Sequence, residues 1–356
     1  MSEQIPPSAG SGPVGTPSAG VRPAGTPPAG PPPAGSSSAG APSAFPIRYA
    51  GWIGRLVRAP LYRATLGRVA ESRGLRLALL LAVPLLWIAT FSLGPIVEMA
   101  RISFIDNYPL PPGETAHWTL DNYALFFRES VYFMPFIRSL IFAFVVTAVT
   151  LVVVYPVAYY VAKVVSPQRR ILALLLLLTP FWAGELIRTF SVIMLLANRG
   201  AVNWLLREFG LIDRPIPMLY TFFSLGFGVI YLISLFMLLP LYSAIEKIPR
   251  SLIDAAADLG AGPWTRFRRV ILPLSKDGIV SGCSLVFLTT VGVFAAPLLL
   301  GGPTTTIFPE VIAQLFHGSN DKWPEGSAFA ILMLIASLTL VGMFMRIAGG
   351  KSTRFM

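Results

Sequence analysis

A short charged stretch interrupts the apolar C-terminal half of the chain, and its residue types suit a docking helix. It reads DAAADLGAGPWTRF from Asp254 and continues into RRVILPLS, between two long apolar runs. Ser251 and Asp254 have the S-x-x-D spacing of a capping box. The alanines at 255–257 favour a helix and keep its surface thin. Such a helix is suited to enter a groove on another protein, which is binding chemistry and not catalysis.

Glycine and proline divide this stretch into two expected helices with a corner between them. Gly260 suits the left-handed residue that ends a helix. Pro263, after Gly262, suits a first helical position, and Pro273 is expected to end the second helix. The residues alone leave two interpretations open. The stretch is either a capped connector whose arginines reflect membrane orientation, or a docking element for a cytoplasmic partner.

A second group of candidate residues lies inside an apolar segment that contains TPFWAGELIRTF. Charged side chains are costly within a membrane and are therefore functional candidates. Glu185 and Arg188 are three residues apart, so they are placed to neutralise each other on one helix. The alternative is that Glu185 faces a transport pathway and attracts a cation, while Trp182 and Phe190 offer aromatic faces for cation–π contact.

The composition indicates the scaffold that must position these residues. The chain has 356 residues, of which 54% are hydrophobic and 13% charged, whereas a soluble chain carries about 25% charged residues. Apolar runs of about 20 residues cross a bilayer as helices, because lipid cannot satisfy free backbone groups. The sequence therefore predicts an all-α membrane protein with six transmembrane helices, at residues 76–98, 135–162, 171–195, 222–245, 277–300 and 328–347.

The distribution of lysine and arginine predicts the orientation of these spans. With a cytoplasmic N-terminus, 20 of the 28 basic residues but only 6 of the 17 acidic residues lie inside. This asymmetry follows the positive-inside tendency of membrane proteins. Both termini, including the tail 348–356, and the charged loop at about 246–275 are then expected to be cytoplasmic. The basic balance reflects orientation and gives no reason to expect nucleic acid as a partner.

The N-terminal region differs from the spans in composition. Residues 1–46 repeat short Pro, Ala, Gly and Ser units, so they are expected to stay disordered, as a flexible tail or a proline-rich docking segment. They have no apolar core that would mark a signal peptide. Residues 47–75 mix arginines with apolar side chains. They predict either an amphipathic helix on the inner membrane surface or a poorly ordered basic lead-in.

Few residues in the chain suit a metal or redox site. Cys283 lies alone in an apolar run, which excludes an intramolecular disulfide and a CxxC-type metal site. His117 and His317 are far apart in polar connectors, and ordinary loop histidines are favoured over a shared metal site. We predict no catalytic residue, no metal and no cofactor bound by this chain.

The spacing in the charged stretch resembles the EAA loop of ATP-binding-cassette (ABC) importer permeases. That pattern has Glu-Ala-Ala, a glycine four residues after the second alanine, and a hydrophobic-Leu-Pro near its end, here at residues 271–273. Asp254 departs from the usual glutamate and has a shorter reach. The resemblance implies that the loop couples an ATPase to the spans through Asp254, Ala255, Ala256, Leu259, Gly260, Ala261, Phe267, Leu272 and Pro273.

The resemblance covers residues 76–347 and extends to the spermidine/putrescine branch of these permeases. WTLDNYALFF, VVVYPVAYYVAK and FAAPLLLGGP carry it outside the loop. It implies the type I importer permease fold and a first permease subunit in a bacterial inner membrane. The implied partners are a cytoplasmic ABC ATPase dimer that uses ATP and Mg²⁺, a second permease and an external substrate-binding protein. No P-loop G-x-x-x-x-G-K-[ST] occurs in the chain, so hydrolysis belongs to a partner.

Two other classes of function, an ion-coupled transporter and a membrane scaffold, fit the sequence less well than an importer permease. An ion-coupled secondary transporter of a small organic cation would favour paired intramembrane acids and an internal repeat, whereas the sequence has one candidate acid and no evident repeat. A membrane scaffold would have no need for an EAA-type loop. The outer segments 99–134, 196–221 and 301–327 are the expected docking surface for a binding protein, and NRGAVNWLLREFG is expected to form a short amphipathic helix there.

Overall fold

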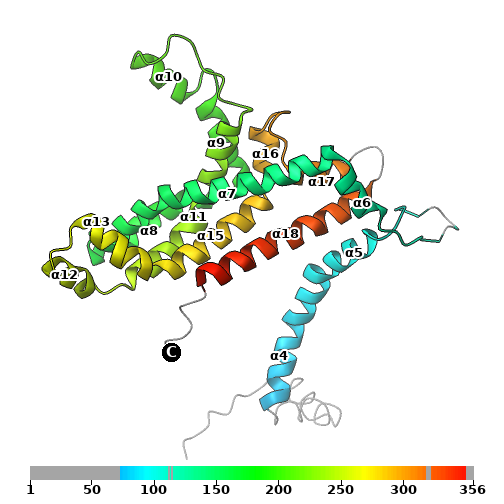
Figure 1. The fold of residues 1–356 in the computed structure, drawn as a ribbon, viewed down its shortest axis with the longest axis horizontal. Coiled ribbons are helices and arrows are strands. Elements are labelled where there is room, and N and C mark those ends of the chain that lie inside the picture. Colours follow the sequence, from blue (N-terminus) through cyan, green and yellow to red (C-terminus); the bar gives the residue numbers. More distant parts are fainter. Residues whose placement is uncertain (1–72, 111–112, 114, 318–321, 350–356) are drawn as a thin grey trace, which may run out of the picture. The chain divides into compact units, whose positions relative to one another are not determined.

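The computed structural model describes residues 73–110, 113, 115–317 and 322–349. Within these ranges the chain is helical apart from connecting loops and one isolated β-bridge between Ile105 and Trp118 (Figure 1). The predicted all-α class is confirmed. The expected tail 1–46, nearly all of the segment 47–75 and the last residues of the tail 348–356 lie outside the described residues.

The first predicted span is a helical rod with exposed apolar side chains. It consists of α4 (Arg73–Ile88), a π-helical turn η2 (Ala89–Leu93) and α5 (Gly94–Ile102). Residues Leu80–Ile102 are long and apolar enough to cross a membrane. Only α5 packs closely on another described helix, α18 (Trp323–Gly349). Lipid or another protein must therefore cover most of this rod, since so much apolar surface is unfavourable in water.

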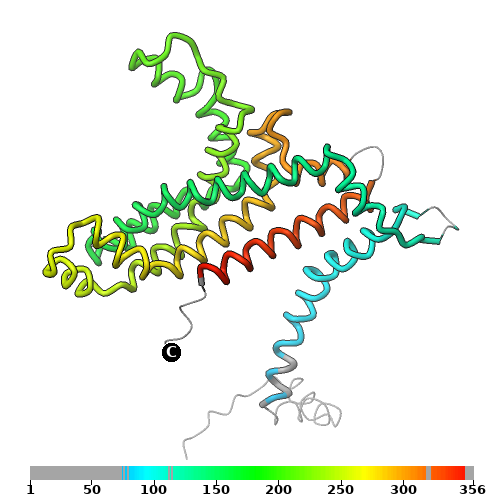
Figure 2. The backbone as a smooth tube through the Cα atoms, in the orientation of Figure 1, coloured from blue at the N-terminus to red at the C-terminus, as the bar shows by residue number. Residues whose placement is uncertain are grey.

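The packed bundle is formed by four helices, and Figure 2 traces their backbones. They are α7 (Ser130–Tyr159), α11 (Phe222–Glu246), α15 (Lys276–Val291) and α18. α11 packs on both α7 and α15, and α15 packs on α18. A second, aromatic cluster joins α6 (Asp121–Arg128) and α17 (Phe308–His317) to the bundle, with the ring of Phe126 against those of Phe308 and Phe329.

The third predicted span, 171–195, is broken in two. The chain forms α8 (Pro167–Leu178), a 3₁₀ turn η4 (Thr179–Trp182) and α9 (Glu185–Leu196). Pro180 lacks the N–H for a regular helical bond, and Gly184 is extended with ψ 154°. The prediction of a single continuous helix over 171–195 is therefore wrong. α10 (Ala201–Glu208) follows and matches the expected short amphipathic helix.

The fifth predicted span, 277–300, is also interrupted. α15 ends at Val291, and the shorter α16 (Ala295–Leu300) begins after Gly292. On the other side, α15 meets the helical segment Pro263–Leu274 at a bend of 68°. The described residues contain five helices long and apolar enough to cross a membrane, or up to six if this bent pair is one span. The coarse architecture therefore agrees with the prediction, while two of the six expected spans are discontinuous.

Two glycines bring α15 into direct contact with α11. Gly278 and Gly282 have the G-x-x-x-G spacing that lets helix backbones approach closely. A Cβ built on Gly278 would lie 2.7 Å from the carbonyl oxygen of Pro240, and one on Gly282 would lie 2.8 Å from Sδ of Met237. At Gly278 the nearest atoms are the Cβ of Ala244 and the backbone of Pro240, and neither can rotate away as a long side chain can.

We expect Gly278→Ala to destabilise the bundle by about 1–3 kcal/mol, because overpacking a close helix contact forces the helices apart. The measurement is thermal unfolding of the purified protein in detergent, in which the variant should melt at lower temperature. Gly342→Ala in α18 is the matched control, since nothing lies within 4 Å of a Cβ there. Equal melting temperatures for the two variants would contradict the proposed close packing.

Candidate functional site

The predicted docking helix exists, but it starts differently from the expectation. α12 spans Arg250–Asp258, and its N-cap is Pro249, with no side-chain hydrogen bond at the cap. The proposed capping box from Ser251 to Asp254 is therefore wrong. Extended Pro249 is the N-cap, so the helix begins at Arg250, and Ser251 is already inside it. Asp254 lies in the middle of α12 and is exposed. Its carboxylate does not cap the helix, so it is available to a partner.

The C-terminus of α12 explains the spacing of the alanines and the glycine. Gly260 has φ 79°, the left-handed conformation expected from the sequence. The N–H of Ala261 donates to the carbonyl of Ala256 (3.0 Å), and that of Gly260 donates to Ala257 (2.8 Å). These two bonds form a Schellman motif, which satisfies carbonyls that a helix end leaves free. Ala256, Gly260 and Ala261 are thus parts of a single helix-terminating structure.

Large apolar side chains project from the corner after α12. Leu259 is 89% exposed and Trp264, in α13 (Pro263–Arg266), is 70% exposed. Pro263 occupies the first turn of α13, as predicted. Leu252 on α12 is also exposed. We call the exposed side chains of Leu252, Asp254, Leu259 and Trp264 the corner surface, and its mixture of apolar groups with one acid is typical of a protein-binding site.

The inner side of the corner is anchored to the bundle by Phe267. Its ring packs at 90° on that of Tyr155 in α7, with 5.4 Å between centroids, and stacks on Trp264 at 5.3 Å. The hydroxyls of Tyr155 and Ser275 are hydrogen-bonded at 2.8 Å. Tyr155 and Ser275 were not predicted as site residues, because they are 120 residues apart in the chain. Phe267 thus belongs to the predicted site as an anchor within this chain.

Pro273 was predicted to end the second helix, but the helix ends one residue later, after Leu274. The turn η5 (Phe267–Ile271) is π-helical, with the N–H of Leu272 donating to Phe267, and α14 (Leu272–Leu274) follows it. Because Pro273 has no N–H to continue an α-helical ladder, a wider turn before it is expected. The helix then ends after Leu274, at the bend into α15. Leu272 is exposed, whereas Ile271 before it is buried.

Arg188 and Glu185 do not form the ion pair that their spacing permits. Arg188 is buried, with its Nε donating to the carbonyl of Ala183 (3.2 Å) and its Nη1 to that of Leu232 (3.1 Å). Its guanidinium also lies 4.8 Å from the ring centre of Phe181. The neutralisation hypothesis is therefore wrong. Arg188 satisfies backbone carbonyls beside the break between η4 and α9 and ties that break to α11.

The other three residues of the predicted pathway group face outward. Trp182 is 90% exposed, and Phe190 and Glu185 are also exposed. The aromatic partner of Arg188 is Phe181, not Trp182 or Phe190. The structure thus separates the group into a buried arginine with a structural role and an exposed acid with two aromatic residues. This second set is placed to meet lipid, a second subunit or a solute.

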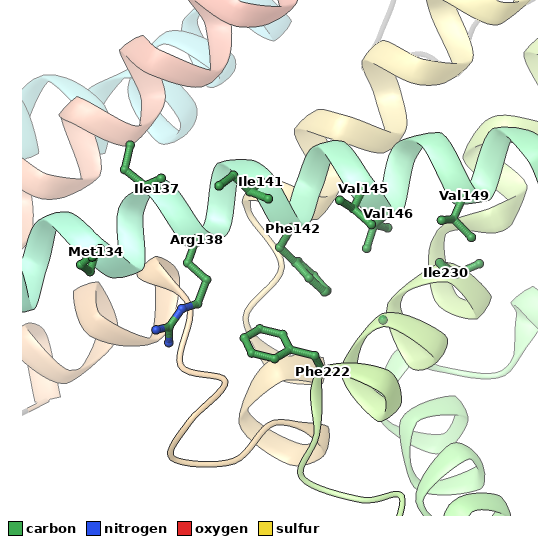
Figure 3. Close-up of a pocket in the computed structure, with 11 residues that line it drawn as sticks. Met134, Ile137, Arg138, Ile141, Phe142, Val145, Val146, Val149, Phe222 and Ile230 are labelled. Atoms are coloured by element: carbon green, nitrogen blue, oxygen red, sulfur yellow. The ribbon is translucent and has the colours of Figure 1, made fainter.

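A groove of about 500 Å³ between α7 and α11 was not predicted from the sequence (Figure 3). Its lining is almost entirely apolar and includes Ile141, Phe142 and Phe222. Arg138 supplies the one cationic side chain of the lining, and its Nη1 donates to the carbonyls of Thr304 (3.1 Å) and Thr306 (3.3 Å). An arginine inside the second predicted span was the signal that could have drawn attention to this region.

No group of three or more His, Cys, Asp or Glu side chains that could hold a metal ion occurs in the described part of the chain. Cys283 is buried there as a free thiol. The described side chains form no nucleophile–base arrangement at the corner surface or around α9. What these two regions offer is an exposed corner with apolar side chains and one acid, and an exposed face of α9.

Comparison with known proteins agrees with this picture. The chain matches the binding-protein-dependent transport system inner membrane component family over residues 75–350. It is 36% identical over 265 residues to the spermidine/putrescine transport system permease protein PotB of Haemophilus influenzae, covering 73% of this chain and 90% of that protein. To PotB of Escherichia coli it is 38% identical over 218 residues, covering 61% and 78%.

The fold has a relative among solved structures. A chain of a bacterial alginate ABC transporter, crystallised with an alginate pentasaccharide-bound periplasmic protein, aligns with a TM-score of 0.64. The alignment covers 79% of this chain and 96% of that one at 18% identity, so it shows a common fold. With the family match over residues 75–350, these findings show that the chain belongs to the binding-protein-dependent inner membrane components and is a permease subunit of an ABC importer.

Proposed function

We propose that this permease imports a polyamine such as putrescine or spermidine and that the corner surface receives the ATPase that drives it. The observation that carries the coupling role is the Schellman-terminated α12, whose Asp254 and Leu259 are exposed while Phe267 anchors the same loop to α7. The polyamine class rests on the similarity to two PotB proteins. ATP and Mg²⁺ are then used by the partner ATPase dimer, and this chain binds neither.

We further propose six spans in a type I arrangement, with both termini and α12 in the cytoplasm. The bent pair Pro263–Leu274 and Lys276–Val291 supplies the fifth span, and α8 with α9 supplies the third. Lys163 contacts the backbone at the end of α11, next to the start of α12. With Arg170 and Arg250, this lysine places three basic side chains at the same end of the bundle as the corner surface, which supports the positive-inside orientation.

The proposed partners follow from surfaces on opposite ends of the bundle. The corner surface at the inner end fits a cytoplasmic ATPase. At the outer end, α10 exposes Trp204 and Leu205 while its other face packs on the core through Val202 and Leu206. We assign this outward face, with the neighbouring outer segments, to a substrate-binding protein. The exposed face of α9 is assigned to a second permease subunit, with the solute pathway between the two.

The charges of the described residues favour the exposed face of α9 over the groove as the route of a cation. The groove is apolar, and its one charged side chain is that of Arg138. A guanidinium repels an ammonium group, and the apolar lining offers it no compensation for lost hydration. Glu185, in contrast, exposes a carboxylate between the exposed aromatic rings of Trp182 and Phe190 along the chain. This set combines charge and cation–π contact for a polyamine.

The decisive experiment is reconstitution of the complete importer in proteoliposomes, with its ATPase, second permease and binding protein. We expect uptake of labelled spermidine when ATP is enclosed with the ATPase subunits, and no uptake without ATP. An imposed proton or sodium gradient should not replace ATP. Gradient-driven uptake in vesicles without the ATPase would contradict the proposal and favour an ion-coupled secondary transporter.

Gly260→Val should abolish spermidine uptake while the protein remains in the membrane. A side chain at φ 79° costs about 1–2 kcal/mol, so the end of α12 unwinds and Leu259 is displaced. The measurement is uptake together with co-purification of the ATPase. Gly262→Val is the matched control, because Gly262 has φ −63° and open space around its Cβ position. Equal loss in both variants would contradict a specific role for the left-handed residue.

Glu185→Gln should weaken spermidine uptake, because it removes the exposed negative charge that attracts a cation but keeps the shape of the side chain. We expect the Michaelis constant for the loaded binding protein to change little and the maximal uptake rate to fall. Glu98→Gln, which removes an exposed acid from α5 outside the surfaces assigned to partners, is the control. An unchanged rate in Glu185→Gln would place the pathway elsewhere.

A further inference from the structure

Lys163 and Arg250 connect two helix ends that lie far apart in the sequence. Nζ of Lys163 donates to the carbonyls of Ile248 (2.6 Å) and Glu246 (3.2 Å), at and just beyond the end of α11. In the opposite direction, Nη2 of Arg250, the first residue of α12, donates to the carbonyl of Lys163 (2.9 Å). Lys163 thus caps the backbone just before Arg250, and Arg250 caps the backbone carbonyl of Lys163. We call this reciprocal pair the inner clamp.

The clamp satisfies carbonyls that helix geometry would leave free. The last four carbonyls of α11 have no partner within the helix, and a cation at a helix C-terminus also interacts favourably with the helix dipole. Lys163 itself lies near the end of η3 (Tyr160–Val164), the π-helical turn that closes α7. Its carbonyl is one of the free groups of that turn, and Arg250 supplies the donor.

α8 is tied into the same place by Arg170. Its Nε donates to the carbonyl of Val165 (3.2 Å), and its Nη1 lies 3.4 Å from the carboxylate of Glu246. The side chain of Glu246 is 42% exposed, so this ion pair contributes little by itself. Its importance is positional, because α8 leads directly to the break at η4 and to α9, which carries Glu185 and Arg188.

The corner surface is therefore attached to the bundle in two chemically different ways. Phe267 contacts Tyr155 of α7 through an apolar ring contact behind the corner. The inner clamp attaches the other end of the docking element, the first residue of α12, to η3. Arg170 ties α8 to Glu246 at the end of α11, where Lys163 caps the backbone. A force applied to α12 from the cytoplasm would reach α7 by the first route, and η3 and α8 by the second.

From this geometry we propose that the inner clamp is the element that passes movement of the docking helix to α8 and α9, and that Lys163 and Arg250 are positioning residues for transport. The proposal rests on the coupling role assigned above to the corner surface. The corner surface would then determine whether the ATPase binds, while the clamp determines whether ATP hydrolysis moves the broken third span. Binding and coupling would thus be separable properties of one loop.

The test uses the complete importer in proteoliposomes and measures spermidine uptake and ATP hydrolysis in the same preparation. Lys163→Met and Arg250→Met keep long apolar stems but remove the donors. We expect both variants to retain the ATPase on co-purification and to hydrolyse ATP, while spermidine molecules imported per ATP fall about tenfold, a size consistent with losing charged hydrogen bonds. Lys163→Arg and Arg250→Lys keep a donor and should restore most of the ratio.

Lys247→Met is the matched control, because its exposed side chain lies beside the clamp but makes none of these contacts. An unchanged uptake-to-ATP ratio in Lys163→Met and Arg250→Met would overturn the proposal. Loss of the ATPase from both variants would overturn it as well, since the clamp would then serve assembly. Failure of the coupling role itself has a different signature: Gly260→Val would then retain uptake, or the wild-type importer would show no ATP-dependent uptake at all.

Discussion

The contact between Phe267 and Tyr155 fixes how the charged loop returns to the bundle, and much of that end of the bundle depends on it. Phe267 packs on the ring of Tyr155, and the hydroxyl of Tyr155 is bonded to that of Ser275, at the bend into α15. The bend of 68° directs α15 so that Gly278 meets the backbone of α11. A displaced Phe267 would therefore change the loop, the bend and the helix contact together, which is what a mechanical link between them requires.

Basic side chains have a common structural task in this protein: they donate to backbone carbonyls where helices break or end. Around Arg188, within a predicted span, such carbonyls have no water, and leaving one unsatisfied costs several kcal/mol. Lys163 and Arg250 instead cap exposed helix ends. A guanidinium or ammonium on a long stem can reach across a break and satisfy two carbonyls at once. Among the described residues this is true of Arg138, Arg188 and Lys163, while Arg170 and Arg250 each cap one carbonyl.

Sequence-based predictions that depend on neighbouring residues succeeded, and those that depend on distant partners failed. The helical class, the approximate positions of the apolar segments, the left-handed Gly260 and the first-turn Pro263 follow from local propensity and were predicted correctly. The capping box failed because Pro249 starts α12 earlier than Ser251 would. The Glu185–Arg188 pair failed because the carbonyl of Leu232, 44 residues away, is a better-placed partner. Tertiary partners such as Tyr155 and Leu232 leave no local signal, so the anchor and the clamp could not be found from the sequence.

The same arrangement of cations constrains where a polyamine can travel. The guanidinium groups of Arg138 and Arg188 donate to neutral backbone carbonyls and not to carboxylates, so these hydrogen bonds do not balance their positive charge. A substrate with several ammonium groups would be repelled along such a route, and the repulsion is strong where the dielectric constant is low. Exposed Glu185 lies one helical turn from Arg188 but on the outward side of α9. The electrostatics therefore favour the pathway proposed above, along the outer face of α9 and closed by a second subunit, over one through the middle of this chain.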